Sequence, residues 1–340
     1  MDMEISLKEF KERFSEGLLE IHWKQWSALG VASHVEPERN WLIDLEALVL
    51  STLVLGLKDA RLLNASIEWL IKNGEWLSLQ RVKRIAKVFT RPRAEFSSQF
   101  GPLLDSATFE LLGEVLRKKG QKGWGAESTS SQRTEKSEYE VLFRNFQKRG
   151  IVTEPVLQRS SLLQLRLRGF FGVDAKAEVF VYLLTHAGGN SNSVAKETFL
   201  NQRNVYEILD RWHRTGLLTK VKGPKVGTFT LERKDEWLNA LGLKGMPVYL
   251  NWVNVFHLLN QVLRALSLQP WSEDEYMLSS FFRDILEEAK SLGRSLGISF
   301  PEPDQYPGAG YFSPFALKVL GIIECLEKGQ KGLSQSNKPK

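Results

Sequence analysis

Residues 193–231, SVAKETFLNQRNVYEILDRWHRTGLLTKVKGPKVGTFTL, carry the pattern that decides the fold of this chain. Apolar side chains in the middle of this run stand 3, 4 and 7 residues after the first, at Val205, Ile208, Leu209 and Trp212. That spacing places them on one face of an amphipathic helix. Asn201 is a suitable N-cap before the helix, and Gly216 is a suitable stop after it. The pattern predicts a helix over 202–215 that buries one face.

Two shorter helices are expected before this one, and a hairpin after it. Ala175–Thr185 has the apolar content of a core helix, and two glycines at 188–189 are expected to stop it. Ser193–Thr198 follows a group of capping residues and predicts a second helix. Residues 217–221 and 228–231 then predict two short strands around a basic, glycine-bounded turn. The order expected is three helices and then a hairpin.

This order resembles the winged helix-turn-helix of bacterial transcriptional regulators of the MarR and ArsR kind. The resemblance covers residues 165–235. Its matching features are Ala195 in the second helix, the start at Asn201–Asn204, Val205, Leu209, the exit at Gly216–Leu218 and the glycine-bounded wing. It implies that the third helix enters the major groove of double-stranded DNA while the wing contacts the backbone. It does not extend to the flanking regions.

The candidate DNA-binding residues gather at the start of the third helix and in the wing. The N-terminal end of a recognition helix contacts base edges, where Arg pairs with guanine and Asn or Gln with adenine. From the helices we select Lys196, Asn201, Gln202, Arg203, Asn204, Tyr206 and Arg211. From the wing we select Lys220, Lys222 and Lys225, which suit contact with the DNA backbone. Glu207 and Asp210 on the same helix would repel phosphate if they faced the groove.

The charge of the chain agrees with an anionic partner. The formal net charge is +6, which alone is a weak signal. Between residues 165 and 236, twelve Lys and Arg against eight Asp and Glu leave +4. A homodimer is expected because one winged helix covers only a half-site of DNA. The helical flanks are expected to bind a small-molecule effector or a protein partner.

The domain organisation follows from composition. Residues 1–119 are expected to form a helical domain, 120–138 a polar linker, and 139–240 the winged helix-turn-helix with its lead-in helices. Residues 241–328 are expected to form a C-terminal helical domain, and 329–340 a disordered tail. The fold class expected is mainly α, with one small β-hairpin wing between N- and C-terminal helical domains.

Periodicity in the flanks predicts further helices. They are Leu7–Leu19, Trp41–Leu57, Asn64–Ile71, Leu77–Phe89, Ala107–Arg117, Leu157–Leu167, Val248–Leu266, Asp274–Leu292 and Pro314–Leu326. Ser272 is expected to cap the helix that includes Glu275. The apolar helices 248–266 and 314–326 are the candidate dimer interface. The basic run Arg81–Lys87 is expected to be a solvated face, with a second phosphate-contacting surface as the alternative.

No motif for catalysis or for a cofactor is recognisable. The five histidines lack metal-site spacing, the single Cys325 cannot form an internal disulfide, and no phosphate-binding glycine loop occurs. We therefore expect no catalytic site, no metal and no cofactor. The amino-terminal residues lack the pattern of a signal peptide, and Leu42–Leu57 is too polar to span a membrane. A cytoplasmic protein without membrane contact is expected.

Two other classes of function are open. One is a winged helix that binds proteins, such as an antitoxin or an assembly subunit. The other is an enzyme with an unrecognised site in the helical regions, which predicts a polar, partly buried cluster of acids or histidines. The tryptophans of the flanks are expected to pack in the core, with a ligand pocket as the alternative; they are Trp23, Trp26, Trp69, Trp76, Trp252 and Trp271.

Overall fold

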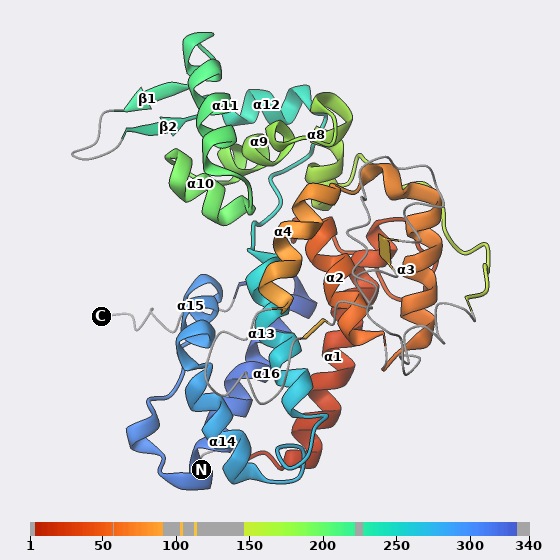
Figure 1. Cartoon of the computed structure of the whole chain (residues 1–340), viewed down its shortest axis with the longest axis vertical. Helices are drawn as coiled ribbons and strands as arrows, with labels where there is room; N and C mark the ends of the chain where they lie inside the picture. Colours follow the sequence, from red (N-terminus) through yellow and green to blue (C-terminus); the bar gives the residue numbers. More distant parts are fainter. Residues whose placement is uncertain are drawn as a thin grey trace, which may run out of the picture.

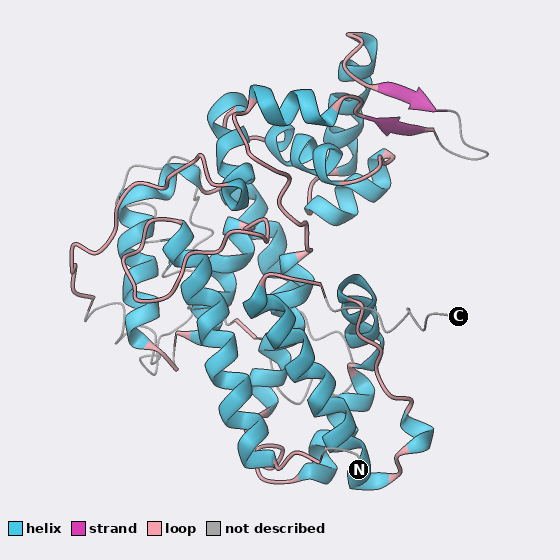
Figure 2. Ribbon diagram, turned by 180° about the vertical axis from the view of Figure 1, so that it is seen from behind, coloured by secondary structure: helices cyan, strands magenta, loops and turns pink. Residues whose placement is uncertain are grey.

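The computed structural model describes residues 4–56, 58–90, 103–104, 112–113, 146–221 and 227–331. These residues form thirteen α-helices and one two-stranded antiparallel sheet, which confirms a mainly α fold with a small hairpin (Figures 1 and 2). The predicted linker 120–138 lies outside the described residues, as do nearly all of the predicted helix 107–117 and of the tail 329–340.

The first and last parts of the chain together form one helical body. Its helices are α1 Leu7–Ala28, α2 Leu45–Leu55, α3 Ala60–Asn73, α4 Leu79–Thr90, α13 Trp252–Ala265, α14 Glu275–Asp284, α15 Leu286–Leu296 and α16 Phe312–Lys328. α1 packs against α16 and α2 against α13 (Figure 1). Buried side chains from both ends of the chain form one apolar cluster, in which Trp26, Trp69 and Trp252 are fully buried. These three tryptophans pack in the core, as expected.

The middle of the chain forms a second unit at one end of this body (Figure 1). We call residues 163–243 the inserted unit. Its elements are α8 Leu163–Phe171, α9 Ala175–Thr185, α10 Ser191–Thr198, α11 Gln202–Arg214, β1 Thr219–Val221, β2 Thr228–Thr230 and α12 Lys234–Ala240. They surround a second apolar cluster. α8 belongs to both clusters, since Leu165 joins the body and Leu167 joins the inserted unit.

The two crossings of the chain between the helical body and the inserted unit lie side by side. The extended segment 40–43 holds both crossings, because Ile43 N donates to Ser161 O (2.9 Å) and Leu42 N donates to Val248 O (2.9 Å). The indole of Trp252 also donates to the carbonyl of Leu42. The two crossings are therefore fixed to one short piece of the body.

A buried network of five charges joins the two parts. Glu46 on α2 accepts from Arg81 Nη1 of the body and from Arg168 Nη1 of the inserted unit, both at 2.7 Å. Arg81 also pairs with Asp44, and Arg168 with Glu178 on α9. Burial alone would raise the pKa of Glu46, but the charges of Arg168 and Arg81 outweigh it and lower this pKa to about 2. Each of the three carboxylates thus pairs with at least one of the two guanidinium groups in the interior.

Three sequence expectations for the body are wrong, one of them only in part. The basic run Arg81–Lys87 is a solvated face at Lys83 and Lys87, which are exposed, but not at Arg81, which is buried because it neutralises Asp44 and Glu46. The N-cap near residue 275 is Asp274 and not Ser272, since the Asp274 carboxylate accepts from the first amides of α14. The predicted helix 274–292 is two helices, which meet at Ile285; neither Gly nor Pro marks this break in the sequence. In the inserted unit, the short helix α12 was not predicted from the sequence.

The two apolar C-terminal helices are not free for a dimer. α13 and α16 bury their apolar side chains in the body, where α2 and α1 cover them. The segment Gly308–Lys328 is long and apolar enough to cross a membrane by length and composition alone, but half of that window is buried, so this is weak evidence. A dimer would need another surface.

Replacing Arg168 by alanine leaves Glu46 and Glu178 buried without their main shared counter-charge. We expect the free energy of unfolding to fall by about 3–5 kcal/mol, measured by urea denaturation followed by circular dichroism. Arg166→Ala in the same helix is the matched control. Arg166 is only half-buried and donates to Leu157 O, so about 1 kcal/mol is expected. Equal losses in the two variants would contradict a structural role for the network.

His22 makes the stability depend on pH. Its ring is fully buried, Nδ1 donates to Leu18 O (2.8 Å), and Nε2 accepts from the Ser51 hydroxyl (2.8 Å). Nδ1 must be the donor, because a carbonyl only accepts. Burial lowers the pKa of His22 to about 4, against an unfolded value of about 6.5. The unfolded chain therefore binds more protons, and stability is full above pH 6.5 and falls below it.

Between pH 7 and 5 we expect His22 to reduce the free energy of unfolding by about 2 kcal/mol. Glu46 acts in a lower window, from its ordinary pKa near 4.5 down to about 2, so it does not interfere. Urea denaturation of the wild type and of His22→Gln at pH 7 and at pH 5 separates the contribution of His22 from that of Glu46. A variant that kept the full wild-type loss between pH 7 and 5 would refute the assignment.

Candidate nucleic-acid interface

α10 and α11 form a helix pair around a three-residue turn. The Asn190 side chain caps α10 and forms a capping box with Ser193. α10 ends where Phe199 adopts a left-handed conformation, with φ of 58°, which turns the chain sharply. Asn201 then caps α11 by accepting from Arg203 N (3.0 Å) and Asn204 N (3.3 Å). The predicted N-cap and start of α11 are confirmed, while α10 begins two residues before the predicted Ser193.

α11 has one buried face and one exposed face. Val205, Ile208 and Leu209 are buried in the apolar cluster with α9. Trp212 is partly buried and packs edge-on against Phe180, with ring centroids 5.7 Å apart. These four residues are the predicted inward face, which is confirmed. The outward face carries Arg203, Asn204, Tyr206 and Arg211, all exposed.

The first turn of α11 divides into residues that fix the helix and residues that remain available. Asn201 is used as the cap, and Gln202 Nε2 donates to Ser191 Oγ on α10 at 2.7 Å. The Asn201 side chain therefore fixes the start of α11, and the Gln202 side chain holds α11 against α10. Within the described residues, the Asn204 side chain makes no hydrogen bond. Arg203, Asn204 and Tyr206 are thus the side chains of this turn that a ligand can engage at low cost.

The two acids on α11 form ion pairs on the helix surface. Arg203 Nε lies 3.2 Å from Glu207 Oε1, and Arg214 Nη2 lies 2.9 Å from Asp210 Oδ2. Both are i,i+4 pairs, and the Arg203 and Glu207 side chains are 87% and 57% exposed. Exposed pairs of this kind contribute at most about 1 kcal/mol, so a stronger anionic partner can displace them. The acids reduce the positive charge of this face without blocking it.

The hairpin lies next to α11 (Figure 1). β1 and β2 pair with Lys220 opposite Phe229, and the Lys220 ammonium lies 5.1 Å from the Phe229 ring centroid. Gly189 forms a further antiparallel bridge to Phe229. A Cβ on Gly188 would lie 2.8 Å from Phe229 O, so glycine is required there for close approach to β2. α9 spans Ala175–Thr185, as predicted, and the two glycines follow three residues after its end.

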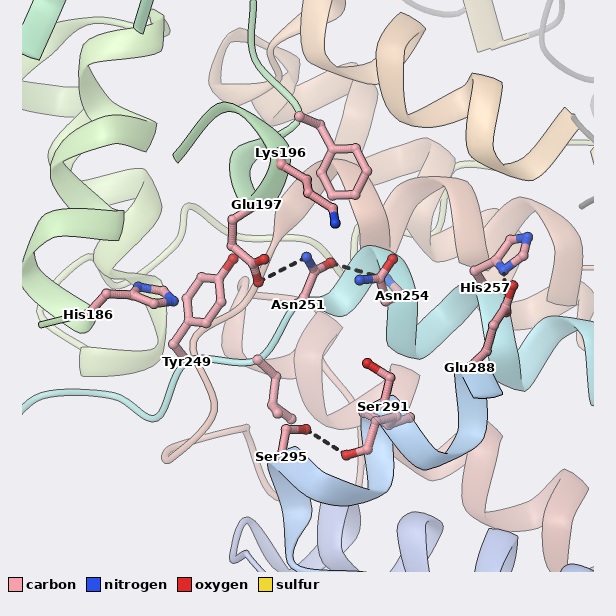
Figure 3. A pocket seen from close by; sticks show the side chains of 13 residues that line it. His186, Lys196, Glu197, Tyr249, Asn251, Asn254, His257, Glu288, Ser291 and Ser295 are labelled. Atoms are coloured by element: carbon pink, nitrogen blue, oxygen red, sulfur yellow. Dashed lines mark hydrogen bonds and ion pairs between the residues drawn. The ribbon is translucent and has the colours of Figure 1, made fainter. Parts of the chain in front are cut away.

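The structure brings together only part of the predicted set. Arg203, Asn204, Tyr206 and Arg211 share the exposed face of α11, and Lys220 lies on the adjacent hairpin. Lys222 and Lys225 lie outside the described residues. Lys196 lines a different cleft, between α10 and the helical body (Figure 3). Lys196 is therefore not grouped with the α11 face, since its side chain points into this cleft.

The same cleft contains a polar cluster that sequence reasoning missed. His257 Nδ1 lies 3.3 Å from Glu288 Oε2 and 2.7 Å from Gln261 Nε2. Such a partly buried histidine and acid pair is what the enzyme alternative predicts. Among the described residues, however, no hydroxyl or thiol hydrogen-bonds to the His257 ring, and no group of three His, Cys, Asp or Glu side chains could hold a metal ion. The i,i+4 spacing of 257 and 261 was the one signal available in the sequence.

Comparisons with known proteins found no relative. A scan against protein-family models, a search of curated proteins and a search of solved structures each returned no match. The function proposed below depends on the geometry of α10, α11 and the hairpin.

Proposed function

We propose that this chain binds double-stranded DNA through a winged helix-turn-helix made of α9, α10, α11 and the β1–β2 hairpin. One observation carries the proposal. The first turn of α11 presents Arg203, Asn204 and Tyr206 to solvent, opposite a buried apolar face that fixes the helix on its unit. In this proposal α11 enters the major groove and the hairpin contacts the phosphate backbone.

The chemistry of the exposed face supports DNA as the ligand. Arg203 can donate to guanine and Asn204 can pair with adenine. Arg211, one turn further along, forms no ion pair within the described residues and suits a phosphate oxygen. Lys220 adds positive charge on the hairpin beside the helix. We further propose a role in transcriptional regulation, in the cytoplasm and as a homodimer that covers two half-sites.

A protein partner for the same unit is the second candidate. Two apolar side chains at the corner between α8 and α9 are exposed, Phe170 at 66% and Val173 at 37%. Exposed aromatic residues are enriched where proteins associate. This candidate predicts that Phe170→Asp abolishes function while Arg203→Ala leaves it intact, which is the opposite of the expectation for DNA binding.

The first test compares Arg203→Ala with Arg39→Ala in a gel-shift titration. The probe is the DNA upstream of the chain's own gene, with scrambled competitor, at low and moderate salt. Arg39 is the matched control, because it is 75% exposed, pairs with Glu36 at 2.8 Å and lies on the helical body. Loss of a base contact by Arg203→Ala should weaken specific binding by about 1–3 kcal/mol, or roughly 5- to 150-fold.

Arg39→Ala should leave the same affinity within about two-fold, because an exposed charge far from the interface contributes little. Weak binding that disappears with salt equally for both DNA sequences would reduce the attraction to non-specific charge. Equal effects of the two substitutions would also reject contact by α11.

Glu207→Gln provides a test with the opposite sign. It removes the acid that holds Arg203 at 3.2 Å and the repulsion between that acid and phosphate. We expect the affinity for DNA to rise by about three- to ten-fold at low salt, with a smaller gain at high salt because of screening. Fluorescence anisotropy on a labelled duplex measures the change. Unaltered or weaker binding by Glu207→Gln would place this face of α11 away from the DNA.

A further inference from the structure

Tyr206 is an exposed aromatic side chain on a surface of α11 that is otherwise charged and polar. It is 46% exposed, and it is neither part of the apolar cluster of the inserted unit nor one of the side chains packed against that cluster. Within the described residues its hydroxyl makes no hydrogen bond and its ring contacts no other aromatic ring. Its charged neighbours at spacings of three and four residues are Arg203 and Asp210. The ring therefore contributes little to the packing of its own unit and is open to a ligand.

Tyr206 lies on the flank of α11 that faces the hairpin (Figure 1). His213 follows it by seven residues, which is close to two helical turns, so the two side chains share one flank. The His213 ring hydrogen-bonds to Leu218 O at 2.9 Å and lies 6.0 Å from the Phe229 ring of β2.

Arg203 stands between two different kinds of side chain. Successive residues of a helix are about 100° apart, so Asn204 lies to one side of Arg203 and Tyr206 lies to the other. The first turn of α11 thus offers a guanidinium group in the middle, an amide on one flank and an aromatic ring on the flank beside the hairpin.

The major groove of DNA offers one apolar group that suits such a ring. The base edges in this groove present hydrogen-bond donors and acceptors, and thymine alone adds a C5 methyl group. An aromatic ring placed over a purine or cytosine edge would cover polar atoms without satisfying them, which is unfavourable. Over a thymine methyl group, the same ring removes apolar surface from water on both sides of the contact.

The charges around Tyr206 favour a base edge over the phosphate backbone. A tyrosine hydroxyl can also donate to a phosphate oxygen. The carboxylates of Glu207 and Asp210 stand one and four residues further along the helix, however, and carboxylates repel phosphate. A base edge carries no net charge, so these carboxylates do not repel it. The aromatic ring is therefore the part of Tyr206 that suits the DNA.

We infer that Tyr206 determines specificity for thymine, because its ring covers the C5 methyl group of one thymine in each half-site. The inference rests on the proposed DNA binding by α11 and adds the base that this side chain selects. Side chains three residues apart on a helix have Cβ atoms about 5–6 Å apart, and successive base pairs are about 3.4 Å apart. The thymine therefore lies one or two base pairs from the guanine that Arg203 contacts.

The first step of the test removes only methyl groups from the DNA. The duplex upstream of the chain's own gene is synthesised once with thymine and once with uracil, which lacks the C5 methyl group and keeps the hydrogen-bonding groups. The full chain should bind the uracil duplex about four-fold more weakly if one methyl group is contacted, and about 16-fold more weakly if each half-site contributes one, from the free energy of burying one carbon. Fluorescence anisotropy of an end-labelled duplex gives both Kd values.

Three variants then locate the contact on Tyr206. Tyr206→Ala should bind the thymine duplex as weakly as the wild type binds the uracil duplex, and its two Kd values should agree within about two-fold. Tyr206→Phe keeps the ring and should keep the preference for thymine. Tyr276→Ala is the matched control and should behave as the wild type, because Tyr276 is 60% exposed on α14 of the helical body. Circular dichroism checks that all three variants fold.

The outcomes separate this inference from the proposed function. Absence of specific binding to the thymine duplex by the wild type would reject both. Specific binding with the same Kd for the two duplexes would overturn the contact with thymine and leave DNA binding by α11 intact. A thymine preference that survives in Tyr206→Ala, or that is lost in Tyr206→Phe, would also overturn it, because another side chain or the Tyr206 hydroxyl would then be responsible.

Discussion

Glu46 is the charge on which the arrangement of the two parts depends. A carboxylate in the interior is costly unless counter-charges and hydrogen bonds surround it, and Glu46 receives both arginines of the network. One arginine comes from the body and the other from the inserted unit, so neither part satisfies Glu46 alone. The three acids against two arginines leave one negative charge, and Asp44, Glu46 and Glu178 all lie at helix N-terminal ends, where the backbone dipole offsets it.

This network also reaches the helix pair that faces DNA in our proposal. Arg81 Nε donates to Thr198 O at 3.0 Å, at the carboxyl end of α10, just before the turn that leads into α11. Hydrogen bonds to a charged group are directional and costly to leave unmade, so they set the orientation of α10 more sharply than apolar contact would. One side of α10 is thus held by the body and another lines the cleft, while α11 keeps its exposed face free of both.

The sequence predicts the elements of the inserted unit well and their surroundings poorly. α9 follows from its apolar content, and α11 follows from the cap at Asn201 and from a regular apolar spacing, all of which are local signals. Arg81 and Arg168 occupy polar positions of amphipathic patterns, and such a pattern does not distinguish water from a buried carboxylate as the partner of an arginine. Lys196 is a basic residue in the expected helix, yet its neighbours in the cleft come from α13 and α15, far away in the sequence. Periodicity also could not foresee that α1 and α16 share one core.

The pairing of α1 with α16 gives this chain an unusual order of assembly during synthesis. The apolar face of α1 is made first, and its partner helix follows only after the residues between Ala28 and Phe312 have been translated. At about 5–20 residues per second this takes roughly 15 to 60 s. The inserted unit is complete well before then and has an apolar cluster of its own. A chain still attached to the ribosome would therefore carry the inserted unit beside an incompletely folded helical body. Chaperones bind exposed apolar surface of the kind that this body would present.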